Sequence, residues 1–139
     1  MRNKLKIFSK GHLKATAYLA DGSTKVLYDG PNAINNTPGC EIVAHSLGGD
    51  TIFNINQLTA YKASSPLKSR GFTRVDYPNP GQVEFTAVFL EADFDDTLDE
   101  LGLESAGWGK FSQVTGLSIH KDSTMRLAIT WTITIQTLV

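Results

Sequence analysis

The chain has 139 residues, of which 41% are hydrophobic and 19% charged, with one cysteine, three histidines and a formal charge of -1 at pH 7. This balance argues against a nucleic-acid coat, which would need a strong basic excess. One cysteine excludes an internal disulfide and, with three histidines, a Cys/His zinc site. No stretch approaches the ~20 apolar residues of a membrane span. We therefore expect one domain over 1–139, made in the cytoplasm, that binds neither nucleic acid nor membrane.

The first part of the chain predicts a β-hairpin. Apolar and polar residues alternate around an Asp21-Gly22 turn, which favours strands near 12–20 and 24–29. His12, on the first strand, is expected to be a polar surface residue.

One helix is predicted next, in NNTPGCEIVAHSLGGD. Thr37 can cap it and Pro38 suits its first turn. Its expected apolar stripe comprises Cys40, Val43, Ala44 and Leu47. Cys40 is expected to pack as a small apolar residue. Five residues of helix separate it from His45, which argues against a nucleophile pair.

Strand signals return after the helix. TIFNINQLTAY (51–61) alternates, KASSPLKSRG (62–71) is rich in Ser and Lys and predicts a loop, and RGFTRVDY (70–77) is a further strand candidate. GQVEFTAVFLEAD (81–93) alternates clearly and predicts a strand. The sequence leaves open whether the segment 93–109 is helical or extended. Its aspartates could cap a helical turn, whereas the spacing of its leucines also fits one face of a strand.

The last third predicts a strand near 110–119, a turn at Lys121-Asp122-Ser123 and a closing strand, MRLAITWTITIQTLV. One face of the closing strand is apolar, and the other carries Thr130, Thr132 and Thr134. An uncharged β-favouring face is a pairing hazard on a lone edge. We therefore expect this strand to be central in its sheet or to continue into contact with another copy. The predicted fold is mainly β, an antiparallel β-sandwich of about seven or eight strands with one short α-helix.

No pattern predicts an enzyme, a cofactor or a metal centre. HSLGG lacks the first glycine of a nucleophile elbow, and no glycine-rich loop has phosphate-binding spacing. Seven of the fourteen acidic residues lie in 91–104, but the sixth position of an EF-hand loop beginning at Asp93 holds Leu98 where glycine is needed. A solvated acidic loop is the preferred interpretation, with a cation site of another type as the alternative.

Charge is segregated along the chain. Five bases precede the first acid, Asp21, and the window 75–109 holds nine acids and no base. Opposite potentials of this kind suit contact between copies. The candidate interface residues are Lys4, Lys6, Lys10, Asp93, Asp95, Asp96, Trp108, Thr130, Thr132 and Thr134. Chance clustering on a solvated surface is the alternative.

The order of several motifs resembles a group of small virion structural proteins of tailed bacteriophages. These motifs are Asn35, Leu47-Gly48, the VEFTAVF strand, Glu100-Leu101-Gly102-Leu103, the turn at 121–124 and the strand LAITWTITI. The resemblance covers about residues 25–139. The commoner members of this group carry a Gly-Thr-Gly stretch after the first strand that follows the helix. This chain departs from them, because the same place reads NQLTAYKASS.

The resemblance implies a β-sandwich without enzymatic activity, located in the virion as part of a tail, tail fibre, collar or baseplate. Its partners would be other copies of itself and other virion proteins. It also implies that Glu100-Leu101-Gly102-Leu103 is a strand, with Asp95-Asp96 as the turn before it. The alternatives are a capsid decoration protein and a module that binds a host-surface receptor or glycan, in which Trp108, between two glycines, makes the contact.

Overall fold

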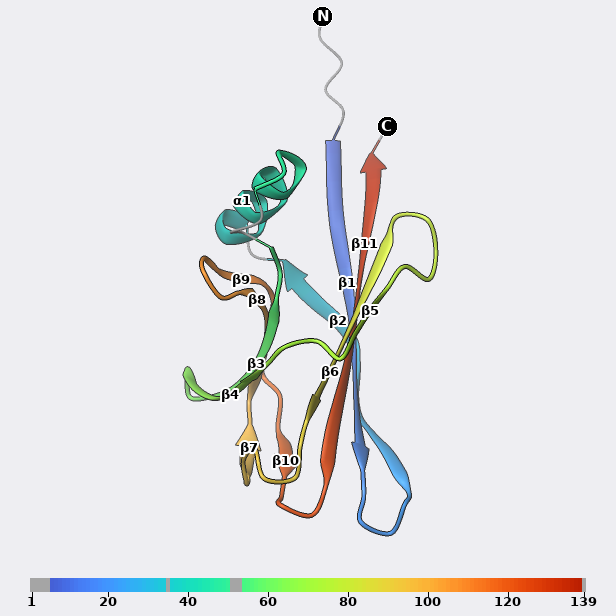
Figure 1. Ribbon diagram of the computed structural model, residues 1–139, viewed down its shortest axis with the longest axis vertical. Coiled ribbons are helices and arrows are strands. Elements are labelled where there is room, and N and C mark those ends of the chain that lie inside the picture. The colour runs from blue at the N-terminus through green and yellow to red at the C-terminus, as the bar shows by residue number, and fades with distance from the viewer. Residues whose placement is uncertain (1–5, 35, 51–53, 139) are drawn as a thin grey trace, which may run out of the picture.

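The computed structural model describes residues 6–34, 36–50 and 54–138 (Figure 1). These residues form eleven strands and one helix, so the predicted mainly-β, sandwich-like fold is confirmed, whereas the predicted number of strands was too low. Nine strands form one antiparallel sheet in the order β4-β3-β8-β9-β2-β1-β11-β6-β5, and β7 and β10 form a small second sheet.

The large sheet curls into two halves that face each other (Figure 1). One half consists of β1 (Lys6–Tyr18), β11 (Arg126–Leu138), β6 (Gln82–Phe89) and β5 (Arg74–Asp76). The other consists of β4 (Ser65–Arg70), β3 (Gln57–Lys62), β8 (Glu100–Ser105) and β9 (Gly109–Val114). The strand β2 (Thr24–Ile34) pairs with β1 and, at its end, with β9, and so joins the halves.

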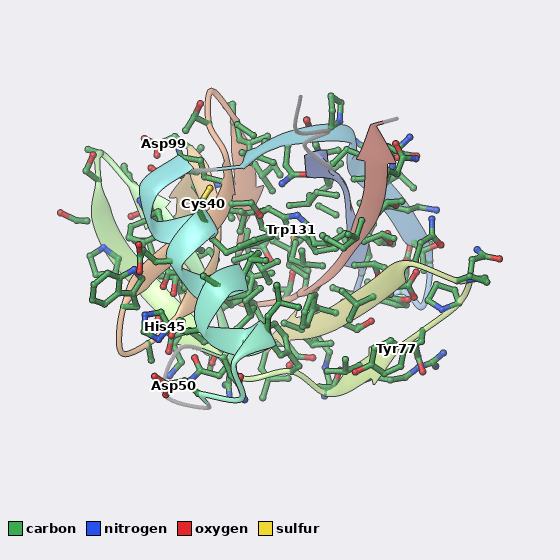
Figure 2. The ribbon with its side chains drawn as sticks, turned by 90° about the horizontal axis from the view of Figure 1, so that it is seen from above. Cys40, His45, Asp50, Tyr77, Asp99 and Trp131 are labelled. Atoms are coloured by element: carbon green, nitrogen blue, oxygen red, sulfur yellow. The ribbon has the colours of Figure 1, made fainter. Side chains whose placement is uncertain are left out.

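The core lies between these halves, where inward residues of alternating strands meet. Trp131, on β11, is fully buried there and pairs in register with Leu13 of β1 and Phe85 of β6 (Figure 2). Every second residue of β11 from Leu127 to Ile133 is buried, as its period-two pattern predicted. The closing strand is central, between β1 and β6, which confirms that alternative of the prediction.

The helix α1 (Asn36–Leu47) is present where it was predicted, but its predicted apolar stripe was wrong at every residue except Val43. Ile42 is 2% exposed and Val43 partly buried, whereas Cys40, Ala44 and Leu47 face solvent. The helix therefore contacts the body of the protein through a face that includes Gly39, Ile42 and Val43, and Cys40 is an exposed thiol. The side chains of the predicted capping residues, Thr37 and Pro38, lie outside the described part of the structure.

The predicted loop at 62–71 was also wrong, because it contains β4, the edge strand of the large sheet. Ala63 and Ser64 both have positive φ, 49° and 66°, which is the geometry of a two-residue hairpin turn. Asn-Gly and Asp-Gly are the usual residues of such turns, and their absence hid the hairpin. The strand predicted near 110–119 is two strands, β9 and β10 (Ile119–Lys121), interrupted where Gly116 has φ 71°.

The segment of open type, 93–109, is extended. It contains β7 (Asp96–Leu98), which pairs with β10, and β8, which pairs with both β3 and β9. The strand that the resemblance implied at Glu100-Leu101-Gly102-Leu103 is confirmed, while Asp96 belongs to β7 and not to a turn.

Candidate functional site

The strands β1 and β11 extend beyond the rest of the sheet as a two-stranded ribbon, here called the arm (residues 6–10 and 135–138; Figure 1). The pairing of β1 with β2 ends at Gly11, and the pairing of β11 with β6 ends at Thr134. Within the described part of the chain, neither outer edge of the arm has a ladder partner past these points. Such a ribbon presents unpaired backbone groups on both sides.

The direction of these backbone groups follows from one hydrogen bond. The Ile135 N–H donates to the Gly81 carbonyl at 2.8 Å, on the β6 side of β11. Because N–H groups alternate between the two neighbours of a strand, the Thr137 N–H points to the same side, beyond the end of β6. The β1–β11 pairing therefore leaves this donor available for another strand.

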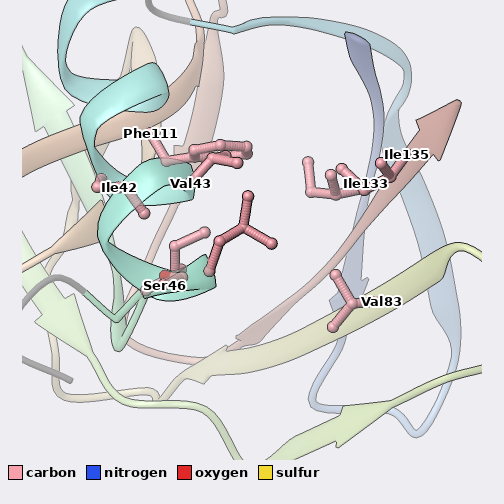
Figure 3. Close-up of a pocket in the computed structure, with 9 residues that line it drawn as sticks. Ile42, Val43, Ser46, Val83, Phe111, Ile133 and Ile135 are labelled. Carbon is pink, nitrogen blue, oxygen red and sulfur yellow. The ribbon is translucent and has the colours of Figure 1, made fainter. Parts of the chain in front are cut away.

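An apolar cavity of about 240 Å³ lies at the base of the arm, between α1 and the strands β6 and β11 (Figure 3). Its walls include Ile42 and Val43 from the helix and Val83, Ile133 and Ile135 from the sheet. Leu47, also at its wall, is 80% exposed, and Ile135 is 43% exposed. Exposed apolar side chains thus adjoin the unpaired edge of β11.

The predicted threonine face lies on the outer surface of the sheet and is half-buried. Thr134, Thr132 and Thr130 stand opposite three basic or histidine residues of β1, namely Lys10, His12 and Lys14. Gln82 donates to the Thr134 hydroxyl at 3.1 Å, and the Thr132 hydroxyl donates to Glu84 at 3.3 Å. His12, exposed as predicted, pairs with Asp29. Lys6 and Lys10 belong to the arm, and Lys4 lies outside the described residues.

The acidic interface candidates are mostly paired within the chain. Asp96 forms an ion pair with Lys62 at 2.6 Å, and Asp93 forms one with Arg70 at 2.5 Å. Within the described ranges, Asp95 is exposed and has no ion pair. The acidic part of the segregated charge is therefore largely neutralised by ion pairs within the chain, and charge steering between copies has fewer acidic groups than the sequence indicated.

The Asp93 carboxylate ties the acidic loop to the edge strand β4. Arg70 donates to it from Nε at 2.7 Å and from Nη2 at 2.5 Å, and the Leu90 N–H donates at 2.8 Å. The side chain is only 7% exposed. The bonds from Arg70 are the main cause that holds the pKa of the Asp93 carboxyl below its ordinary value of 3.8.

Asp93→Asn is expected to destabilise the protein at pH 7 by about 2 kcal/mol, the usual range for hydrogen bonds to a charged group. Since the folded pKa is lower than the unfolded one, this contribution is complete above the unfolded value and is lost as pH falls through the folded value. Thermal unfolding from pH 7 to pH 2 measures it. The difference in stability between wild type and variant should disappear as the pH falls below about 4. Asp95→Asn, in the same loop, is the matched control, and a gap that stays constant with pH would contradict the ion-pair explanation.

The Lys121 ammonium lies at the centre of the acidic loop, in the position that a bound cation would take. Its side chain is fully buried, and its ammonium donates to the carbonyls of Glu91, Phe94 and Asp122 at 3.0–3.1 Å. It also lies 5.1 Å from the centre of the Phe94 ring. Burial lowers the pKa of the Lys121 amine, and the neighbouring carboxylates oppose that shift. Carbonyls suitable for a cation are thus occupied by a side chain of the protein itself. Within the described ranges, no group of three or more His, Cys, Asp or Glu side chains has metal-binding geometry.

A second cavity, of about 330 Å³ and polar, lies on the outer face of the β3–β8 pair beside the β8–β9 turn. Glu104, only 5% exposed, is at its base. Its carboxylate accepts hydrogen bonds from Gln57 at 3.0 Å, from Thr59 at 2.7 Å and from the Tyr61 hydroxyl. Trp108, the predicted contact residue, is 47% exposed at the same cavity. We call this cavity the Glu104 cleft.

The sequence indicated Trp108 but not the other members of the cleft. Gln57, Tyr61 and Glu104 share one side of their strands only because β3 pairs with β8 in a particular register. The available signal was the alternation in QLTAY and ELGLES, which separates the outward residues from the buried leucines.

Comparison with protein-family models, curated proteins and solved structures gives no match. Among the helices that the structure describes, none has the length and apolar character needed to cross a bilayer.

Proposed function

We propose that the chain is a non-enzymatic structural subunit of a bacteriophage virion. It would be present in several copies in a tail, collar, baseplate or fibre-associated position, after synthesis in the host cytoplasm. The arm carries this proposal, since an isolated two-stranded ribbon is only marginally stable in water and exposes two unpaired edges. The resemblance of the motifs to small virion proteins supports the assignment to a phage particle.

The occupant that fits the arm is a strand from a second copy of the same chain. A strand added beyond the end of β6 would accept a hydrogen bond from the Thr137 N–H and would continue the β6–β11 ladder. It would also place side chains over the apolar cavity at the base of the arm, next to Ile135 and Leu47. The arm sequence KIFSK contains adjacent Ile7 and Phe8, so the same segment of a neighbouring copy supplies apolar residues for this position.

Thr137→Pro tests this proposal, because proline removes the N–H that would bond to the neighbouring copy. The β1–β11 ladder should persist, since that N–H points away from β1. Native mass spectrometry and light scattering are expected to detect an oligomer of the wild type at micromolar concentration. The dissociation constant of this oligomer should be at least about tenfold higher in the proline variant, which is equivalent to the loss of roughly one good hydrogen bond.

Thr137→Ala is the matched control, since it keeps the N–H and should assemble as the wild type does. Circular dichroism and thermal unfolding of the proline variant establish that the monomer is folded. A wild type that remains monomeric at every concentration, or an oligomer that the proline does not weaken, would contradict strand addition through the arm.

A further inference from the structure

Three hydrogen bonds from the strand β3 fix the orientation of the carboxylate in the Glu104 cleft. Gln57 and Thr59 both donate to Oε1, and Tyr61 donates to Oε2. A carboxylate offers about four acceptor positions, so among the bonds of the described residues these three leave one position on Oε2. Burial raises the pKa of the Tyr61 phenol far above its usual range, and the Glu104 carboxylate adds to this effect, so Tyr61 remains a donor.

Gly102 makes room for this arrangement. A Cβ at that position would lie 2.8 Å from Oε2 of Glu104 and 3.3 Å from the Tyr61 ring. Any larger residue would therefore displace the carboxylate or the phenol. Beside them, Lys110 bonds to Glu100 at 2.5 Å and lies 4.1 Å from the centre of the Tyr61 ring, which holds that ring in place from the other side. The polar groups of the cleft are positioned before any ligand arrives, which lowers the entropic cost of binding.

Trp108 adds a large aromatic surface to these polar groups. It lines the same cleft and is half-exposed, whereas the other tryptophan of the chain is fully buried. A pyranose ring presents a face of C–H groups that packs on an indole and an edge of hydroxyls that bond to carboxylate and amide groups. The cavity volume lies at the lower end of the range for small-molecule sites.

We propose that the Glu104 cleft binds a neutral saccharide, with Trp108 as the stacking surface and Glu104 and Gln57 as the hydroxyl-binding groups. The Lys110 charge is matched by Glu100, so the cleft keeps the negative charge of Glu104 and disfavours acidic sugars. The inference does not depend on assembly through the arm, because the cleft is formed by β3, β8 and the β8–β9 turn of one chain.

The geometry supports binding and not hydrolysis. Among the described residues that line the cleft, Glu104 is the only carboxylate, and Glu100 on the same strand face does not line it. Most glycosidases use a pair of Asp or Glu side chains that flank the bond to be cleaved. Glu100 is also engaged by Lys110.

The test is a titration of the full-length protein with neutral oligosaccharides of glucose, galactose or mannose, followed by calorimetry and by saturation-transfer NMR. At least one series is expected to bind with a millimolar or tighter dissociation constant. Trp108→Ala should weaken that binding at least about tenfold, the effect of losing a buried aromatic contact. Insoluble polysaccharides of the same sugars, tested by co-sedimentation, distinguish a chain ligand from a short free oligosaccharide.

Tyr77→Ala is the matched control, because Tyr77 is a 77% exposed aromatic residue that does not line the cleft (Figure 2). It should bind as the wild type does. Glu104→Gln, checked for folding by its thermal transition, should also weaken binding. The proposal is overturned if no neutral oligosaccharide binds at millimolar concentration, or if Trp108→Ala binds as tightly as Tyr77→Ala.

Discussion

Lys121→Met is expected to lower the midpoint of thermal unfolding by about 10 °C. Methionine fills a similar volume but donates no hydrogen bond, so the carbonyls of Glu91, Phe94 and Asp122 would lose the Lys121 donor. A buried acceptor left unsatisfied costs about 1–3 kcal/mol. For the three carbonyls we expect roughly 3 kcal/mol in total, because the substitution also removes the cost of burying a charge. For a domain of this size, 1 kcal/mol corresponds to about 2–4 °C.

Two further variants test the charge and the size of the Lys121 side chain. Lys25→Met, at an exposed position, removes the same charge and should change the midpoint by less than about 2 °C, as is usual for surface substitutions. Lys121→Arg keeps the charge but forces a larger planar group into the same space and should also destabilise the protein. If Lys121→Met unfolds at the temperature of the wild type, the ammonium does not hold the acidic loop.

Lys121 also shows what can and what cannot be predicted from the alternation of inward and outward residues. The sequence predicts a turn at Lys121 because lysine, aspartate and serine follow one another there. In the structure it shares the inward parity of Ile119, and both are buried while His120 between them is exposed. The parity was visible in the sequence. That a charged residue would continue the pattern inward was not, because two of its three carbonyl partners, those of Glu91 and Phe94, come from a loop that only the fold brings close.

Local patterns predicted most elements, and long-range pairing decided the rest. The period-two pattern of VEFTAVF and LAITWTI correctly predicted which residues of β6 and β11 are buried. The helix stripe failed because the amphipathicity of α1 is weak, so the neighbouring strands determine which face is covered. Neither the arm nor the Glu104 cleft could be predicted, since each depends on where one ladder ends or on how two strands register.

Trp131→Ala is expected to be the most destabilising single change in the described core, by about 3–5 kcal/mol. Trp131 is the largest fully buried side chain and lies between Leu13 and Phe85 on the two neighbouring strands. Its indole N–H has no hydrogen-bond partner in the described part of the chain. The ring therefore stabilises the fold through packing, against the cost of one unpaired donor.

Trp131→Phe separates these two contributions. Phenylalanine retains an aromatic ring and removes the unpaired N–H, so its cost should be about 1–2 kcal/mol, well below that of alanine. Urea unfolding measures both variants, and midpoints that shift without a change in slope identify a change in stability alone. Thr132→Ala, on the outward face of the same strand, is the control and should cost less than 1 kcal/mol, as surface changes usually do. A phenylalanine variant as unstable as the alanine variant would indicate that the indole N–H is bonded after all, since its removal would then add a loss to the missing volume.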